Sequence, residues 1–150
     1  MPTALTVQIR RLPSSLGLDL PTYITAGAAG MDLYAAVAEH LVFEAGAIAL
    51  VPTGLEVAIP DGFEGQVRPR SGLAVRHGIS LPNTPATIDA DYRGEIRVPI
   101  INLWRATFHV TRGMRIAQLV VAPVVRVTWD EVVELPATSR GGQGFGHSGV

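Results

Sequence analysis

Short runs of apolar residues alternating with polar ones recur along the chain and are separated by glycines and prolines. Runs of this kind are typical of β-strands, and none carries the 3.6-residue period of a long helix. The pattern predicts strands at Thr6–Arg10, His40–Phe43, Ala47–Val51, Leu55–Ile59, Gly65–Arg68, Gly94–Asn102, Thr107–Val110, Arg115–Val121 and Val124–Trp129. Many short strands joined by Gly/Pro turns predict an all-β fold, a jelly-roll-like barrel or sandwich.

Two segments depart from the strand pattern. A single short helix is predicted over Gly72–Arg76, with Ser71 as its N-cap. From Ala137 onward the sequence ATSRGGQGFGHSGV holds five glycines and few apolar residues, so it cannot bury enough surface to fold alone. We therefore expect a β domain over residues 1–136 and a flexible C-terminal arm over residues 137–150.

Composition narrows the classes of protein that fit. At 150 residues the chain has the size of one domain, and 47% hydrophobic against 17% charged residues favours an oligomer that buries apolar surface between subunits. A net charge of -1 provides no overall field for a nucleic acid. No segment reads as a signal peptide or a membrane span, so a soluble cytoplasmic protein without a membrane partner is expected.

The residues that could bind metals or act as nucleophiles are few. The chain has no cysteine, which excludes disulfides, thiolate nucleophiles and cysteine-ligated zinc. Its four histidines, at positions 40, 77, 109 and 147, are not spaced as metal ligands along the sequence. A metal site built only from protein side chains is therefore not expected.

Five segments differ from ordinary strand or turn sequence, and their order and spacing are informative together. They are Ala26–Ala35 (AGAAGMDLYA), Arg68–Ile79 (RPRSGLAVRHGI), Asn83–Glu95 (NTPATIDADYRGE), Arg115–Val121 (RIAQLVV) and Arg140–Gly149 (RGGQGFGHSG). Across nearly the whole chain they resemble the five motifs of the trimeric dUTPase family. The resemblance implies hydrolysis of dUTP to dUMP and pyrophosphate in a homotrimer with shared active sites. It also implies Mg²⁺ bound through the substrate phosphates and water, with no direct protein ligand.

Arg70, Ser71 and Gly72 combine a guanidinium, a hydroxyl and a close-approach glycine at the predicted helix start. Free backbone N–H groups there attract anions, which makes this tripeptide a candidate triphosphate cradle. The alternative is a capped turn in which Arg70 forms a surface ion pair. The resemblance assigns Ser71 and Gly72 to phosphate contacts.

Residues 88–94 are expected to form a strand, a tight hairpin turn and the approach to a second strand beginning at Glu95. Asp89 is the candidate general base, because a carboxylate beside a water can take the water's proton during attack on phosphorus. The alternative is that Asp89 and Asp91 are both ordinary turn residues. By resemblance, Tyr92 packs under the deoxyribose and excludes a 2'-hydroxyl.

The same resemblance implies further substrate contacts in the pocket and the arm. Asn83 and the backbone at Thr87 and Ile88 would read the uracil edge, and Arg97 would line the pocket. In the arm, Arg140 would reach the γ-phosphate and Phe145 would cover the uracil ring, closing the arm over an active site. The implied binding residues of the arm that flank this ring are Gly146, His147 and Ser148.

Two polar residues in apolar surroundings, Gln118 and Asp32, each have two alternative roles. Gln118 interrupts an apolar strand and is implied to contact the phosphate tail, although it could also lie on a solvent-facing side of the strand. Asp32 is implied to order the waters of the metal without binding it, and it could equally pair with an arginine to hold the fold.

Two rival functions fit parts of the sequence. A dCTP deaminase of the same fold would need a catalytic glutamate in the strand after residues 88–94, where this chain has Pro99. A non-catalytic jelly-roll domain that binds nucleotides or a partner protein would not need Asp89 or Phe145.

Overall fold

The structure is a computed structural model that describes residues 4–149 and is built almost entirely from β-strands. Within that range its elements are β1 (Gln8–Arg11), η1 (Pro13–Ser15), β2 (Met31–Tyr34), β3 (Leu41–Phe43), β4 (Ile48–Ala58), β5 (Phe63–Arg68), α1 (Ser71–His77), β6 (Ile79–Ser80), β7 (Ala86–Ile88), β8 (Glu95–Asn102), β9 (Phe108–Val110) and β10 (Arg115–Pro123). The predicted all-β, jelly-roll-like class with one short helix is confirmed.

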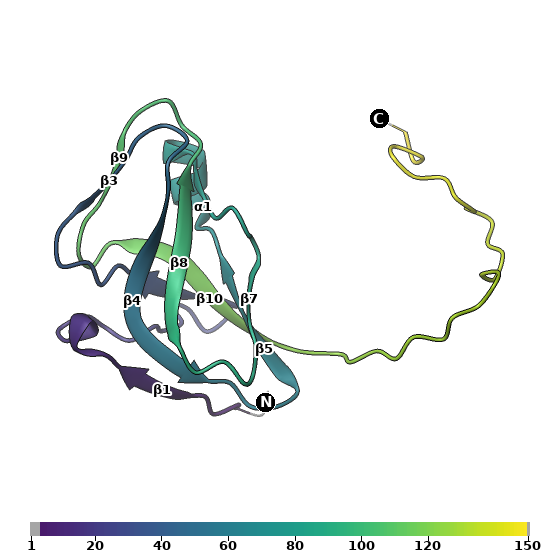
Figure 1. The fold of residues 1–150 in the computed structure, drawn as a ribbon, viewed down its shortest axis with the longest axis horizontal. Helices are drawn as coiled ribbons and strands as arrows, with labels where there is room; N and C mark the ends of the chain where they lie inside the picture. The colour runs from purple at the N-terminus through teal and green to yellow at the C-terminus, as the bar shows by residue number, and fades with distance from the viewer. Residues whose placement is uncertain (1–3, 150) are drawn as a thin grey trace.

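Two four-stranded sheets enclose the core. Their strand orders are β1-β4-β8-β6 and β2-β10-β5-β7, and β3 and β9 form a separate pair. Figure 1 shows β4 and β8 running side by side while β10 crosses them at a steep angle. Alternate apolar residues face inward, as on β8, where Ile96, Val98 and Ile100 are buried. The alternation thus places one face of each sheet against the other.

Strand β4 contains a bulge at Pro52–Glu56. Pro52 pairs with Arg97 and Glu56 pairs with Glu95, so β4 carries two more residues than β8 between the same two rungs. Gly54 within the bulge adopts φ +65°, a conformation that glycine tolerates. The two strands predicted over Ala47–Val51 and Leu55–Ile59 are therefore one bulged strand.

The predicted strand Val124–Trp129 is wrong. Strand β10 ends at Pro123, and Val124 N–H makes the last backbone bond to the body, with Gly62 O at 2.9 Å. Beyond this point the chain leaves the body in an extended path, which Figure 1 shows in yellow-green to yellow. The alternation of Val125, Val127 and Trp129 suits a strand, but within the described part of this chain no neighbouring strand pairs with it.

The helix start differs from the prediction by one residue. Arg70 is the N-cap, with extended backbone at φ -90° and ψ 131°, and Ser71 is the first residue of α1. The helix ends at His77, and the C-cap residue Gly78 adopts φ 62° and donates its N–H to Ala74 O. None of the helices in the described range is long and apolar enough to cross a membrane.

Candidate active site

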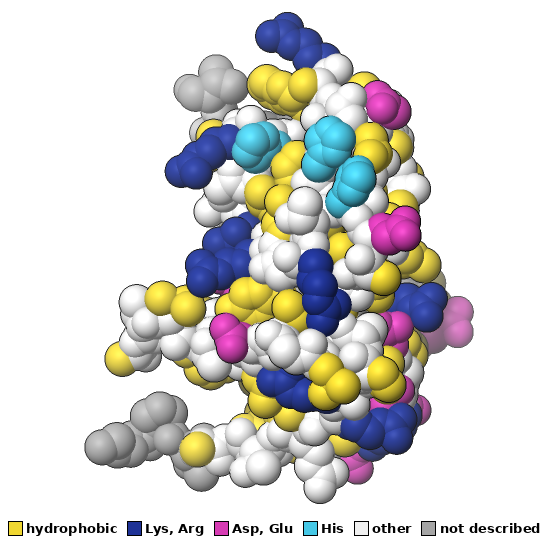
Figure 2. Space-filling model, turned by 90° about the vertical axis from the view of Figure 1, so that its left-hand side faces the viewer, with side chains coloured by type: hydrophobic (Ala, Val, Ile, Leu, Met, Phe, Trp, Pro, Cys, Tyr) yellow, Lys and Arg dark blue, Asp and Glu magenta, His cyan; other side chains and the backbone are white. Residues whose placement is uncertain are grey.

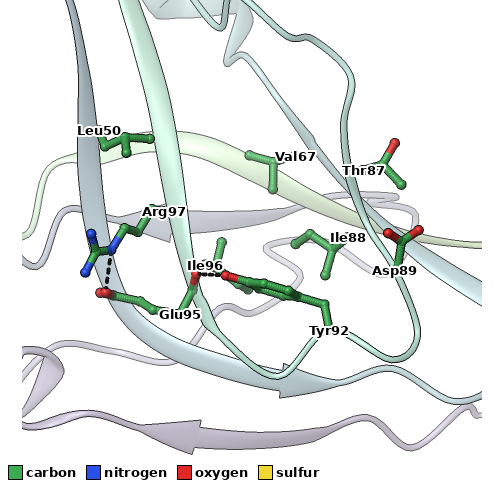
Figure 3. A pocket seen from close by; sticks show the side chains of 9 residues that line it. All are labelled: Leu50, Val67, Thr87, Ile88, Asp89, Tyr92, Glu95, Ile96 and Arg97. Carbon is green, nitrogen blue, oxygen red and sulfur yellow. Dashed lines mark hydrogen bonds and ion pairs between the residues drawn. The ribbon is translucent and has the colours of Figure 1, made fainter.

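A pocket of about 320 Å³ opens between β7 and β8. This volume lies within the range of small-molecule sites. Figure 3 shows Tyr92 reaching toward β8 while Asp89 stands on the β7 side. The lining residues are Leu50, Val67, Thr87, Ile88, Asp89, Tyr92, Glu95, Ile96 and Arg97. The pocket thus brings together five of the residues predicted from the sequence.

The pocket exists because β7 and β8 belong to different sheets. Strand β7 pairs with β5, whereas β8 pairs with β4 and β6. The tight hairpin predicted over residues 88–94 is therefore wrong in one respect, since no ladder joins β7 to β8 within residues 4–149. The connecting turn spans from one sheet to the other, and the strands diverge enough to leave a hollow.

Tyr92 is held in the pocket by its hydroxyl group. The hydroxyl donates a hydrogen bond to the main-chain oxygen of Glu95 at 2.9 Å. The ring lies so close to Gly94 that a Cβ there would stand 2.4 Å from the Tyr92 Oη. Arg93 Nη1 donates to the main-chain oxygens of Ala90 and Tyr92 at 2.7 and 2.8 Å, which braces the turn. Gly94 is thus required for this placement of the ring.

The wall of the pocket formed by β8 carries the carboxylate of Glu95 and the guanidinium of Arg97. Arg97 Nε donates to Glu95 Oε2 at 2.9 Å, and Gly54 N–H in the β4 bulge donates to Glu95 Oε1 at 2.9 Å. Glu95 is a pocket residue that sequence reasoning missed. The signal that could have found it was its position three residues after Tyr92, at the start of a predicted strand.

Asp89 lies at the rim of the pocket, on an exposed stretch of chain. It also lines a second hollow of about 800 Å³, with Asp61, Glu64, Asp91 and Arg126 among its neighbours. Its carboxylate makes no hydrogen bond or ion pair to any side chain or backbone group between residues 4 and 149. A solvent-accessible carboxylate without a protein partner is available to accept a proton from water.

A second cluster surrounds Asp32. Arg70 Nε lies 2.9 Å from Asp32 Oδ1, and Arg115 Nε lies 3.7 Å from Asp32 Oδ2. The ion pair between Asp32 and an arginine, which was the alternative role predicted for Asp32, is therefore present. Nearby, Gln118 Nε2 donates to Pro69 O at 2.9 Å, which holds the residue just before Arg70. Gln118 is half-buried, so this partner satisfies one N–H of its amide.

The structure does not bring all the predicted site residues together within one chain. Figure 1 shows α1, which begins after Arg70, at one end of the body and the β7–β8 connection at the other. Asn83 lies in an exposed turn before β7 and does not line the pocket. Phe145 is fully exposed, and Arg140 Nε donates only to Gln143 O within the arm. The other arm residues predicted to bind substrate, Gly146, His147 and Ser148, are likewise exposed.

Metal ligands do not gather in the described range. There, no three His, Asp or Glu side chains are arranged to hold a metal ion. Figure 2 shows histidines close together on one part of a face, and the rings of His40 and His109 are 6.0 Å apart across the β3–β9 pair. The fold thus brings together two histidines that are far apart in the sequence.

The fold and the pocket define the class of protein: a jelly-roll-like β protein with a small-molecule pocket between two diverging strands. A model of the dUTPase family matches residues 17–149. The chain belongs to the dUTPase family.

Curated relatives agree along nearly the full length. The deoxyuridine 5'-triphosphate nucleotidohydrolase of Rickettsia massiliae (strain Mtu5) is 53% identical over 144 residues, which is 96% of this chain and 97% of the relative. The protein of the same name from Rickettsia rickettsii (strain Sheila Smith) is 52% identical over the same shares.

Solved structures agree as well. A mutant dUTPase of Staphylococcus bacteriophage 80alpha with dUpNHpp superposes with a TM-score of 0.86 at 26% identity, covering 98% of this chain and all of that one. A mutant dUTPase from phage phi11 of S. aureus, described as revealing the coordination of a structural Mg(II) ion, gives a TM-score of 0.77 at 25% identity, covering 89% of this chain.

Proposed function

We propose that the protein hydrolyses dUTP to dUMP and pyrophosphate, with Asp89 as the general base. The observation that carries the role of Asp89 is its unpaired carboxylate at the rim of a pocket that also holds Tyr92. Membership of the dUTPase family supplies the substrate and the products.

The chemistry follows from a water held between Asp89 and the α-phosphorus. Its oxygen forms the new bond to phosphorus, its proton passes to an Oδ atom of Asp89, and the bond from phosphorus to the bridging oxygen breaks. Pyrophosphate then leaves with the electron pair of that bond. A general base in this position contributes about 10²- to 10⁴-fold to the rate. No covalent intermediate is needed.

Substrate recognition is divided among the predicted residues. Tyr92 would pack against the deoxyribose and leave no room for a 2'-hydroxyl, while Thr87 and Ile88 would present backbone groups to uracil. Arg97 would line the same pocket, and Asn83 would approach the base from its exposed turn. Cytosine presents the reversed hydrogen-bonding pattern, so it would leave polar groups unpaired.

The phosphates would be bound by the cluster at the start of α1. Ser71 and Gly72 are exposed there, and the Arg70 guanidinium is partly exposed beside Asp32. Gln118 would act through Pro69, whose carbonyl it holds, and through contact with the phosphate tail. Arg140 of the arm would add a second positive charge at the γ-phosphate.

Magnesium is the metal that this activity implies, and the donor set fits an ion that arrives with the triphosphate. Asp32, the carboxylate nearest the phosphate-binding cluster, is already engaged by two arginines, yet it can still accept hydrogen bonds from metal-bound water. Phosphate oxygens and water would supply the coordination. When bound, the ion offsets phosphate charge and orients the chain of phosphates.

A homotrimer with shared sites is the assembly we propose. Figure 1 shows α1 and the β7–β8 connection at opposite ends of the body, so neighbouring subunits would have to complete each site. Exposed apolar surface supports association: Trp129 is 92% exposed and Val133 fully so, and an apolar groove of about 600 Å³ lies beside β1.

The arm, residues 137–150, would close over a site of another subunit and place Phe145 on the uracil ring. Residues 1–136 would then form the β domain. Location in the cytoplasm and the absence of nucleic-acid and membrane partners stay predictions of the sequence.

The substitution Asp89→Asn tests the proposal. It keeps the shape of the side chain and removes its basicity, so dUTP binding is expected to persist while pyrophosphate release falls at least about 10²-fold. A panel of dUTP, dTTP, dCTP and UTP, with and without magnesium, establishes the substrate. Unchanged turnover in the variant would refute the role of Asp89, and substantial ammonia release from dCTP would overturn the assignment.

A further inference from the structure

We infer that Glu95 is a positioning residue of this site: it holds Tyr92 and Arg97 in place along the pocket and thereby governs affinity for the nucleotide and the choice between deoxyribose and ribose. The inference rests on the proposed function and concerns the wall of the same pocket. Glu95 begins β8, and its side chain is only 13% exposed.

The β4 bulge explains why a carboxylate stands here. The bulge takes Gly54 out of register with β8, so its N–H requires an acceptor other than a ladder carbonyl. Glu95 Oε1 supplies that acceptor at 2.9 Å. The side chain therefore ties the first residue of β8 to the bulge of β4.

The second oxygen of the same carboxylate orients Arg97. Arg97 Nε lies 2.9 Å from Glu95 Oε2, and the arginine side chain is 60% exposed. An ion pair this exposed adds little stability, so its effect is mainly to choose one direction for the guanidinium. Without the carboxylate the Arg97 side chain is free to swing into solvent.

Tyr92 depends on Glu95 through the main chain. The carbonyl that accepts the Tyr92 hydroxyl belongs to Glu95 itself, and the next carbonyl, that of Ile96, accepts from Thr53 Oγ1 at 2.6 Å. The side chain of Glu95 thus anchors the same backbone unit that receives the tyrosine. Releasing this anchor loosens the ring that faces the sugar.

The catalytic carboxylate is held by other elements. Asp89 follows β7, whose ladder partner is β5 in the other sheet, and it makes no contact with Glu95 through a hydrogen bond or ion pair in residues 4–149. A change at Glu95 is therefore expected to act on KM and selectivity and to spare kcat.

Glu95→Ala is the main test, measured as pyrophosphate release from dUTP and from UTP. We expect KM for dUTP to rise about tenfold and the preference for dUTP over UTP to fall about tenfold, with kcat within about twofold of the wild type. Glu95→Gln keeps an acceptor for Gly54 but loses the charge that orients Arg97. It should restore selectivity most of the way and leave KM raised about threefold.

Glu56→Ala is the matched control. Glu56 is the cross-strand partner of Glu95, its side chain is 17% exposed, and it pairs with Arg10 of β1; neither residue lines the pocket. The Glu56→Ala variant loses an ion pair between β1 and β4 that does not line the pocket, so both kinetic constants and the selectivity should stay unchanged. Thermal unfolding of each variant verifies that the protein is folded.

The inference is overturned if folded Glu95→Ala keeps the KM and selectivity of the wild type, or if Glu56→Ala changes them equally. Should Glu95→Ala fail to fold, Glu95→Gln decides, and an unchanged KM in that variant overturns the inference. Failure of the proposed function would appear separately, as a wild type that releases no pyrophosphate from dUTP. Calorimetric titration with dUMP, which needs no turnover, would still compare the pockets of the wild type and the variants.

Discussion

Replacing Gly94 with alanine tests how closely the position of Tyr92 is coupled to activity. Gly94 has a backbone conformation that alanine can adopt, so the substitution adds only a methyl group. That methyl would stand 2.4 Å from Tyr92 Oη and 2.7 Å from Cζ. Ordinary van der Waals contact begins at 3.4 Å, so the ring has to move by about 1 Å.

Moving the ring costs the fold little stability but is expected to lower kcat/KM strongly. Tyr92 is 44% exposed, so its ring can turn outward and sacrifice only the hydrogen bond to Glu95 O, which is worth about 1 kcal/mol. For a domain of this size that loss lowers Tm by about 2–4 °C. A positioning error of this size costs up to about 10²-fold in kcat/KM.

The assay is steady-state pyrophosphate release from dUTP and UTP, paired with a thermal melt. Gly27→Ala is the matched control, because a Cβ at Gly27 meets nothing within 4 Å. We expect Gly94→Ala to lose activity toward dUTP and to discriminate less against UTP, while the control behaves as the wild type. Wild-type kinetics in a folded Gly94→Ala protein would show that the tyrosine does not contact the sugar.

Three further predictions concern the arm, the phosphate-binding cluster and the metal. Phe145→Ala should raise KM for dUTP and leave Tm unchanged, because the side chain is fully exposed; an equal KM in a steady-state assay would remove Phe145 from the site. Gly30→Ala places a Cβ 2.4 Å from Gln118 Oε1 and should break the bond to Pro69 O, which lowers stability by about 1 kcal/mol in denaturant titration and weakens nucleotide binding. Chelation with EDTA should stop pyrophosphate release without shifting Tm, and a lowered Tm would indicate a metal held by the protein itself.

The alternation of apolar residues predicted strands well and their partners poorly. Ile96, Val98 and Ile100 show the period of two that places one face of β8 in the core. The same pattern cannot tell which strand lies alongside, so the separation of β7 and β8 into two sheets was not predictable. The sequence therefore predicted residues that line the pocket but not which strands form its walls, and Glu95 was overlooked.

The segment around Trp129 shows the opposite failure, a strand pattern where the structure has no strand. Its apolar alternation equals that of the core strands, yet Trp129 is 92% exposed. A strand needs a neighbour to receive its backbone hydrogen bonds, and in the described part of this chain none is offered. The roles predicted for residues 140–148 stay predictions for a related reason, since the surface against which we propose that they order would belong to another subunit.

The distance between α1 and the β7–β8 connection has a consequence for mixtures of variants. If each site takes its phosphate cluster and its Asp89 from different chains, a chain altered at Arg70 and a chain altered at Asp89 are both inactive alone. Mixed assemblies would contain some sites in which both intact parts meet. Co-expression of the two inactive chains would then recover part of the activity, as in genetic complementation within a single gene.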